Sequence, residues 1–132
     1  MANVMYKSAK EAFLSGDIDL TSDDIYVALI VTNDVSFDAD DEFLDDVNTG
    51  IVGTPVQLSG ITVTDGVFDS TDPTWDDVTG DQAEAIIMYK WTGSAESSRL
   101  IMWYDTGVTG LPVTPNTGDI TYAVHASGWF AL

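Results

Sequence analysis

Apolar runs of strand length dominate the chain. Residues 25–31 (IYVALIV) form a continuous apolar, β-branched run, which predicts a strand buried on both faces. Residues 84–91 and 99–104 predict two more strands, and the polar connection between them predicts an antiparallel hairpin. Near the C-terminus, the alternation over 119–125 and the apolar end over 128–132 predict further strands, the last one in the core or in an interface.

Between the first two of these strands, the hydrophobic pattern is broken by turn residues. Apolar residues alternate with polar ones over 50–68 once a slip at Ser59-Gly60 is allowed, as at a turn or bulge. Asp65-Gly66 is a strong hairpin-turn signal. We predict loops over 69–80, anchored to the body by Trp75, and over 107–118.

Helical spacing occurs in two places. Residues 1–16 are predicted to form an N-terminal helix that begins at Asn3 as N-cap and ends at Gly16. Its inward face comprises Met5, Ala9, Ala12 and Phe13. Residues 32–48 form a polar, acidic surface excursion, predicted to be mobile in the free protein and ordered by a partner. Within it, residues 38–47 predict a short helix with Phe43, Leu44 and Val47 facing inward.

The fold class follows from one helix and about seven to nine short strands. We predict a mainly β protein, an antiparallel β-sandwich or barrel-like domain with one short N-terminal helix. The 132 residues, of which 45% are hydrophobic, suit a single domain over 1–132 with one core.

Charge narrows the choice of partners. Four Lys and Arg stand against 22 Asp and Glu, which gives a formal net charge of −18. Such a surface repels phosphate groups, so we expect neither nucleic-acid nor membrane binding. Solubility or a saline habitat also explains such charge. There is no cysteine, no apolar run of membrane-spanning length and no secretory signal pattern at the N-terminus, so the chain is expected in the cytoplasm when it is made.

The residues offer little for catalysis. His125 is the only histidine; it falls in a predicted strand, and neither a multi-histidine metal site nor a located triad can be built on it. No Gly-x-Ser-x-Gly elbow occurs. The segment Gly50-Ile51-Val52-Gly53 lacks the spacing and the lysine of a phosphate-binding loop. We therefore expect a protein that is not an enzyme, without catalytic residues or cofactor.

Two acidic clusters raise the question of calcium. They are Asp38, Asp40, Asp41 and Glu42, and Asp69, Asp72, Asp76 and Asp77. Their oxygens suit a hard cation, but the first lacks the glycine and glutamate positions of an EF-hand and the second is no better defined. Solvated loops are the favoured interpretation, and no metal site is predicted. The four tryptophans leave open a carbohydrate-binding adhesion module, although scattered tryptophans in a β domain are more often core residues.

The order of several segments resembles a family of small tailed-bacteriophage virion structural proteins. The segments are 5–20 (MYKSAKEAFLSGDIDL), 24–30 (DIYVALI), 43–46 (FLDD), 84–93 (EAIIMYKWTG), 98–101 (SRLI), 104–107 (YDTG), 111–116 (LPVTPN) and 118–120 (GDI). No single motif is specific, and the order of several carries the resemblance over nearly the whole chain. Trp91 and Trp103 stand where it implies more polar residues, which predicts a different partner surface.

The resemblance implies a particle component, in particular a capsid decoration (cement) protein on the outer capsid surface of the virion. Its implied partner is the major capsid protein, it would be a homo-oligomer with a trimer favoured, and assembly would take place in the host cytoplasm. It brings no catalytic, cofactor or metal residues. A neck, tail or head-fibre component and a carbohydrate-binding module remain as alternatives. The candidate docking segments are the N-terminal helix, the excursion 32–48 and the apolar C-terminus.

Overall fold

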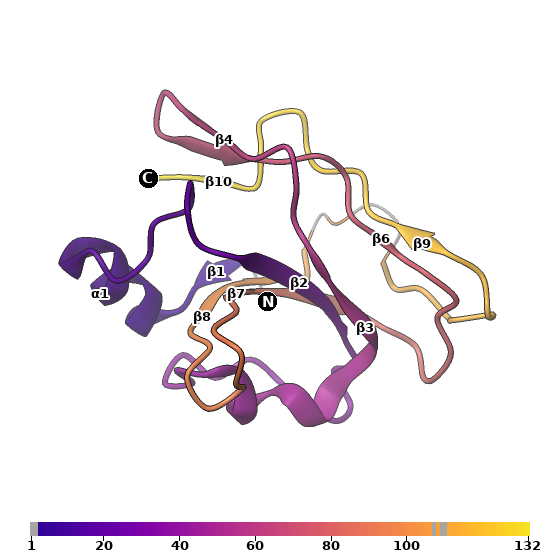
Figure 1. Ribbon diagram of the computed structural model, residues 1–132. Coiled ribbons are helices and arrows are strands. Elements are labelled where there is room, and N and C mark those ends of the chain that lie inside the picture. The colour runs from indigo at the N-terminus through magenta and orange to yellow at the C-terminus, as the bar shows by residue number, and fades with distance from the viewer. Residues whose placement is uncertain (1–2, 107, 109–110) are drawn as a thin grey trace.

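The computed structural model describes residues 3–106, 108 and 111–132, and its centre is a five-stranded antiparallel sheet (Figure 1). The order of the strands is β1-β8-β7-β2-β3. Their bounds are β1 Val4–Met5, β2 Ile25–Ile30, β3 Ile51–Gln57, β7 Ala85–Lys90 and β8 Leu100–Tyr104. The strands predicted over 25–31, 84–91 and 99–104 are therefore confirmed as β2, β7 and β8, and β7 and β8 form the expected antiparallel hairpin.

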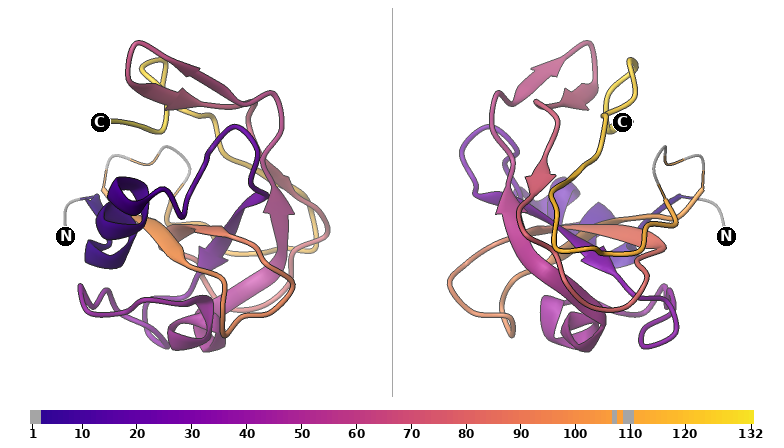
Figure 2. Two further views of the ribbon diagram at one scale, coloured as in Figure 1. Left: turned by 60° about the vertical axis from the view of Figure 1, so that its left-hand side comes forward. Right: turned by 90° about the vertical axis from the view of Figure 1, so that its right-hand side faces the viewer.

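Two small antiparallel sheets and one helix complete the fold. A three-stranded sheet has the order β10-β5-β4, and β6 pairs with β9. Their bounds are β4 Thr62–Thr64, β5 Val67–Asp69, β6 Thr74–Trp75, β9 Ile120–Thr121 and β10 Phe130–Ala131. Helix α1 spans Lys7–Ser15. The hairpin of β4 and β5 projects from the body in both views of Figure 2, and it turns at Asp65-Gly66, where both residues have positive φ. The predicted fold class is confirmed: the chain is mainly β and antiparallel, with one short helix near the N-terminus.

Each face of the large sheet has its own cover. The small sheets cover one face, where Trp75 packs with its indole N–H donating to the Val27 carbonyl at 3.4 Å. This confirms the predicted anchoring of the 69–80 loop. Residues 31–50 cover the other face, below the sheet in Figure 1, through the half-buried Phe37, whose ring lies 5.9 Å from that of Trp103.

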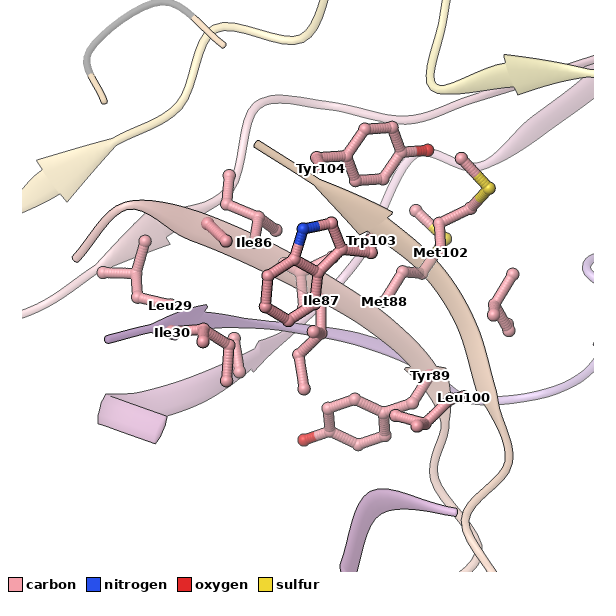
Figure 3. Close-up of a cluster of buried hydrophobic side chains, with 14 of the residues drawn as sticks. Leu29, Ile30, Ile86, Ile87, Met88, Tyr89, Leu100, Met102, Trp103 and Tyr104 are labelled. Atoms are coloured by element: carbon pink, nitrogen blue, oxygen red, sulfur yellow. The ribbon is translucent and has the colours of Figure 1, made fainter. Parts of the chain in front are cut away.

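The core lies along the middle strands. Figure 3 shows the side chains of β2, β7 and β8 packed together, from Leu29 and Ile30 across to Trp103 and Tyr104. Every residue of β7 except Lys90 is buried, and so are all five residues of β8. Continuous apolar runs in these strands reflect this burial on both faces.

The N-terminal segment differs from the prediction over 1–16. Residues 1–2 lie outside the described residues, Val4 and Met5 pair with β8, and the helix begins only at Lys7. Asn3 does not cap the helix: its side-chain Oδ1 accepts the backbone N–H groups of Asp105 at 2.9 Å and Thr106 at 3.0 Å. Pairing with the edge of β8 gives the backbone groups of Val4 and Met5 the hydrogen-bond partners that a helix would otherwise have to supply. Gly16 ends the helix as predicted, in the left-handed conformation with φ 83°.

The excursion 32–48 holds no continuous helix. It contains one 3₁₀ turn, Leu44–Asp46, and a second, Asn48–Gly50, begins at its last residue. Phe43 is extended and bridges to Arg99, so helical geometry begins only after it. Leu44 and Val47 are buried as predicted, while Phe43 is half-buried under the Arg99 guanidinium, 4.6 Å from the ring centre. The segment lies against the sheet, joined to it by the Leu44 N–H to the Ser98 carbonyl at 2.8 Å.

The strand predicted over 119–125 is wrong in extent, since β9 is only Ile120–Thr121. Beyond it, the Tyr122 N–H donates to the Pro73 carbonyl and the Val124 N–H to the Asp72 carboxylate. Pro73 has no N–H to return a hydrogen bond, so the ladder stops there.

Of the predicted 107–118 loop, residues 107, 109 and 110 lie outside the described residues.

Candidate functional site

The four tryptophans fall into two groups. Trp75, Trp103 and Trp129 are buried, and each indole N–H has an acceptor. The acceptors are the Val27 carbonyl at 3.4 Å, the Asp105 carboxylate at 2.9 Å and the Ser70 hydroxyl at 2.8 Å, respectively. These three residues are structural, and Trp103, singled out by the sequence as a partner-surface residue, belongs to the core.

Trp91 is different, because it is only half-buried and lines an open pocket. The pocket, called the aromatic pocket below, has a volume of about 370 Å³. Its walls are Tyr26, Leu44, Asn48, Thr54, Pro55, Tyr89, Trp91 and Ala95. Sites for small ligands or single peptide side chains commonly measure about 300–1,000 Å³. The aromatic pocket therefore has the size and the wall chemistry of a binding site.

Three rings form its floor. Tyr26 and Tyr89 are cross-strand partners on β2 and β7, with ring centres 6.0 Å apart and planes inclined by 20°. The Trp91 ring lies 6.1 Å from Tyr26 and 6.4 Å from Tyr89. Residues two apart on a strand share a face, which brings Tyr89 and Trp91 together. Strand pairing then adds Tyr26 from a distant part of the sequence.

Several polar side-chain groups of the aromatic pocket have no hydrogen-bond partner among the described residues. Among the described residues, no side chain or backbone group bonds the Trp91 indole N–H, the Asn48 amide or the Tyr26 and Tyr89 hydroxyls. Burial, together with the nearby Tyr26, raises the pKa of Tyr89, so its hydroxyl keeps its proton at neutral pH. Unpaired donors on apolar walls are what a ligand with carbonyl oxygens requires.

Acidic residues stand beside the aromatic pocket. The Asp24 carbonyl accepts the backbone N–H of Trp91 at 2.8 Å, and the backbone N–H of Asp45 donates to the Ala95 carbonyl at 3.2 Å. Both carboxylates are exposed. These backbone bonds place the two acids next to wall residues, although neither carboxylate lines the aromatic pocket itself, and the Asp24 carboxylate also accepts the Gln57 side-chain N–H at 3.1 Å. The surroundings of the aromatic pocket, called its rim below, therefore carry negative charge.

The first acidic cluster belongs to the excursion and lies next to α1. Lys7 pairs with Asp40, and the Asp46 carboxylate accepts the N–H groups of Glu42 and Phe43 at 2.9 and 3.2 Å. Burial, with Asp38, Asp46 and Asp40 nearby, raises the pKa of Asp41 to about 6. The hydroxyls of Tyr6 and Ser8 are buried without a hydrogen-bond partner in the described part of the chain.

Two carboxylates of the second cluster, those of Asp69 and Asp72, accept backbone hydrogen bonds, and Asp77 takes part through its backbone N–H. The Asp69 carboxylate accepts the Ser70 N–H at 2.8 Å, Asp72 accepts the Val124 N–H at 2.9 Å, and the Asp77 N–H donates to Asp119 at 3.1 Å. Within residues 3–106, 108 and 111–132, no three His, Asp or Glu side chains are arranged to hold a metal ion.

His125 lies outside any strand, at the start of a turn. Its Nδ1 accepts the Ser127 N–H at 3.0 Å and lies 2.6 Å from the Ser127 hydroxyl. The ring is exposed and its contacts are local, as in a turn-forming residue.

Gly50, from the segment that was compared with a phosphate-binding loop, has a packing role, because a Cβ there would lie 2.8 Å from the Val35 side chain. No helix within the described residues is long and apolar enough to cross a membrane.

No family of known proteins and no curated protein matches this sequence. The aromatic pocket was not predicted from the sequence. The spacing of Tyr89 and Trp91 was available as a signal, but only the pairing of β2 with β7 and the position of the 3₁₀ turns join them to Tyr26, Leu44 and Asn48.

Proposed function

We propose that the chain is a structural component of a bacteriophage particle, an outer capsid decoration (cement) protein that stabilises the shell by bridging capsid subunits. The order of segments that resembles small tailed-phage virion proteins suggests this class. In this proposal the partner is the major capsid protein, and the protein acts as a homotrimer.

The observation that carries the proposal is the placement of the charge. All 22 acids are at least partly exposed, and the described residues form only two ion pairs. A body with this surface is repelled by packed nucleic acid, and this favours the outside of a DNA-filled shell. Decoration needs no chemistry: contacts made only in the assembled particle stabilise it by mass action.

Exposed apolar side chains supply further candidate contacts. Leu14 at the end of α1 is 89% exposed and Leu132 at the C-terminus is 74% exposed. They flank the Phe13–Phe130 ring pair, whose centres are 6.2 Å apart. Two of the three segments proposed for docking, the helix and the C-terminus, thus adjoin one another.

The test is the copy number of the chain in purified, tailless heads, measured by quantitative mass spectrometry relative to the major shell protein. A decoration protein that covers the lattice is expected at about one copy per shell subunit. A few copies per particle would instead indicate the neck, a vertex or a head fibre. Absence from heads would overturn the capsid proposal.

A carbohydrate-binding adhesion module is the second candidate, and one observation favours it. The half-exposed rings of Tyr26 and Trp91 in the aromatic pocket could stack on a sugar. The buried state of the other three tryptophans argues against a broad aromatic platform. Binding to a panel of oligosaccharides separates this candidate from the first.

A further inference from the structure

We infer that the aromatic pocket is a docking site for an extended, proline-containing segment of another protein that carries arginine or lysine. The inference names the chemistry of the partner and rests on the proposed function only in taking that partner to be a neighbouring particle protein. The argument has three parts: the shape of the walls, the free donors and the charge of the rim.

The walls favour an extended segment recognised by its side chains. Rings of Tyr26, Tyr89 and Trp91 offer flat apolar faces, on which proline rings pack in the known modes of polyproline recognition. Addition of a strand is less suitable here. The adjacent β3 is the edge of the sheet, and Pro55 within it has no N–H to donate to a new strand.

The free donors match the backbone of such a segment. A polyproline II chain makes no internal hydrogen bonds, so its carbonyl oxygens need external donors. The Trp91 indole N–H, the Asn48 amide and the Tyr26 hydroxyl line the aromatic pocket without a partner among the described residues. The three buried indoles, by contrast, are already satisfied by the protein itself.

The charge of the rim selects a basic occupant. Asp24 and Asp45 are exposed beside Trp91 and Ala95, and the whole chain carries a net charge of −18. An arginine or lysine next to the prolines gains from these carboxylates and from the ring faces. A second copy of this chain does not fit, since none of its four prolines has a basic neighbour in the sequence.

The probe is a short peptide of alternating proline and arginine, titrated into ¹⁵N-labelled protein while the four indole N–H signals are followed. We expect the Trp91 signal to shift with saturation, while those of Trp75, Trp103 and Trp129 stay in place. Matched peptides with glutamate for arginine, or with alanine for proline, are expected to bind at least tenfold more weakly, a difference of about 1.4 kcal/mol.

Substitutions test whether the peptide binds at the aromatic pocket. Trp91→Phe removes the free indole N–H and is expected to weaken binding about tenfold, as truncation of an aromatic anchor does. The pair Asp24→Asn and Asp45→Asn is expected to weaken binding of the arginine peptide and to reduce its dependence on salt. The pair Asp65→Asn and Asp81→Asn removes the same charge from exposed positions elsewhere and should leave binding unchanged. The three buried indole signals report that each variant is folded.

Three results would overturn the inference: no shift of the Trp91 signal with the peptide, equal binding of the arginine and glutamate peptides, or a Trp91 shift caused by an oligosaccharide but not by the peptide. The inference and the proposed function can be accepted or rejected independently. Peptide binding by a chain that is absent from heads would retain this site and reject the capsid role.

Discussion

Aromatic side chains lie on both faces of the large sheet, but one face has a region in which they stay partly exposed. On the face covered by the small sheets, Trp75 is fully buried, and the Tyr104 hydroxyl donates to the Trp129 carbonyl at 3.0 Å. On the opposite face, where β2 begins and β7 ends, Tyr26 and Trp91 stay half-exposed. The Trp91 indole N–H has no acceptor among the described residues. Burial with satisfied donors marks structural aromatic residues, whereas exposure with free donors marks residues available to a ligand.

The difference arises from the covers. The Trp75 indole, carried by β6 of a small sheet, donates to the Val27 carbonyl of β2, and the Trp129 indole donates to the Ser70 hydroxyl directly after β5. The excursion covers its face with Phe37, Leu44 and Val47 but leaves the aromatic pocket open beside its 3₁₀ turns. The same excursion carries the first acidic cluster, so one segment supplies both a hydrophobic cover and negative charge.

The largest effect is expected from Trp75→Ala on the closed face. Removing a fully buried indole leaves a cavity beneath the small sheets, so the free energy of unfolding should fall by about 3–5 kcal/mol. Urea unfolding followed by circular dichroism measures it. Trp75→Phe, which keeps a ring there, should cost clearly less. A loss below about 1 kcal/mol for the alanine variant would show that the small sheets are not a tight cover.

Tyr104→Phe tests a single buried hydrogen bond on the closed face. It leaves the Trp129 carbonyl without its hydroxyl donor, so we expect the free energy of unfolding to fall by about 1–2 kcal/mol. The matched variant Tyr26→Phe removes a hydroxyl that no described residue bonds, and its unfolding curve should superimpose on that of the parent protein. Equal losses in the two variants would remove the distinction between the faces.

Asp41→Asn tests the charge held by the excursion. The pKa of Asp41 is raised to about 6, above its ordinary 3.8, so the folded chain binds this proton more tightly than the unfolded chain between those pH values. Asp41 therefore favours folding at low pH and opposes it as the pH rises through 6. The variant should gain about 0.5–1 kcal/mol at pH 7, after reduction for solvent screening, and nothing at pH 4.

The measurement for Asp41→Asn is the free energy of unfolding at a series of pH values from 4 to 8, at constant ionic strength. Asp65→Asn, in the exposed turn between β4 and β5, is the control and should keep the pH dependence of the parent protein. A gain for Asp41→Asn at pH 4 equal to that at pH 7 would contradict the assignment.

The smallest effect on stability is expected from Trp91→Phe on the open face. The indole is half-exposed and makes no hydrogen bond to a described residue, so the free energy of unfolding should change by about 0.5 kcal/mol or less. The urea midpoint, compared with that of Trp75→Phe, checks this. A loss as large as that of Trp75→Phe would assign Trp91 to the core and leave the aromatic pocket without its main donor.

The sequence alone was enough for the elements that depend on local pattern. The apolar runs of β2, β7 and β8, the Asp65-Gly66 turn and the end of α1 at Gly16 follow from burial, turn geometry and left-handed backbone preference, which are properties of neighbouring residues. The acidic exterior also follows from composition, because a charge of −18 has no place in a core.

Only the tertiary structure decided which residues face a partner surface. Trp91 and Trp103 looked equivalent in the sequence, but strand pairing buries Trp103 beneath Phe37 and leaves Trp91 open beside Tyr26. In the same way, Val4 and Met5 pair with the edge of β8 and are not part of the helix that the sequence predicted there. Which donors are satisfied and which stay free depends on segments that are distant in sequence, and no local pattern records that pairing.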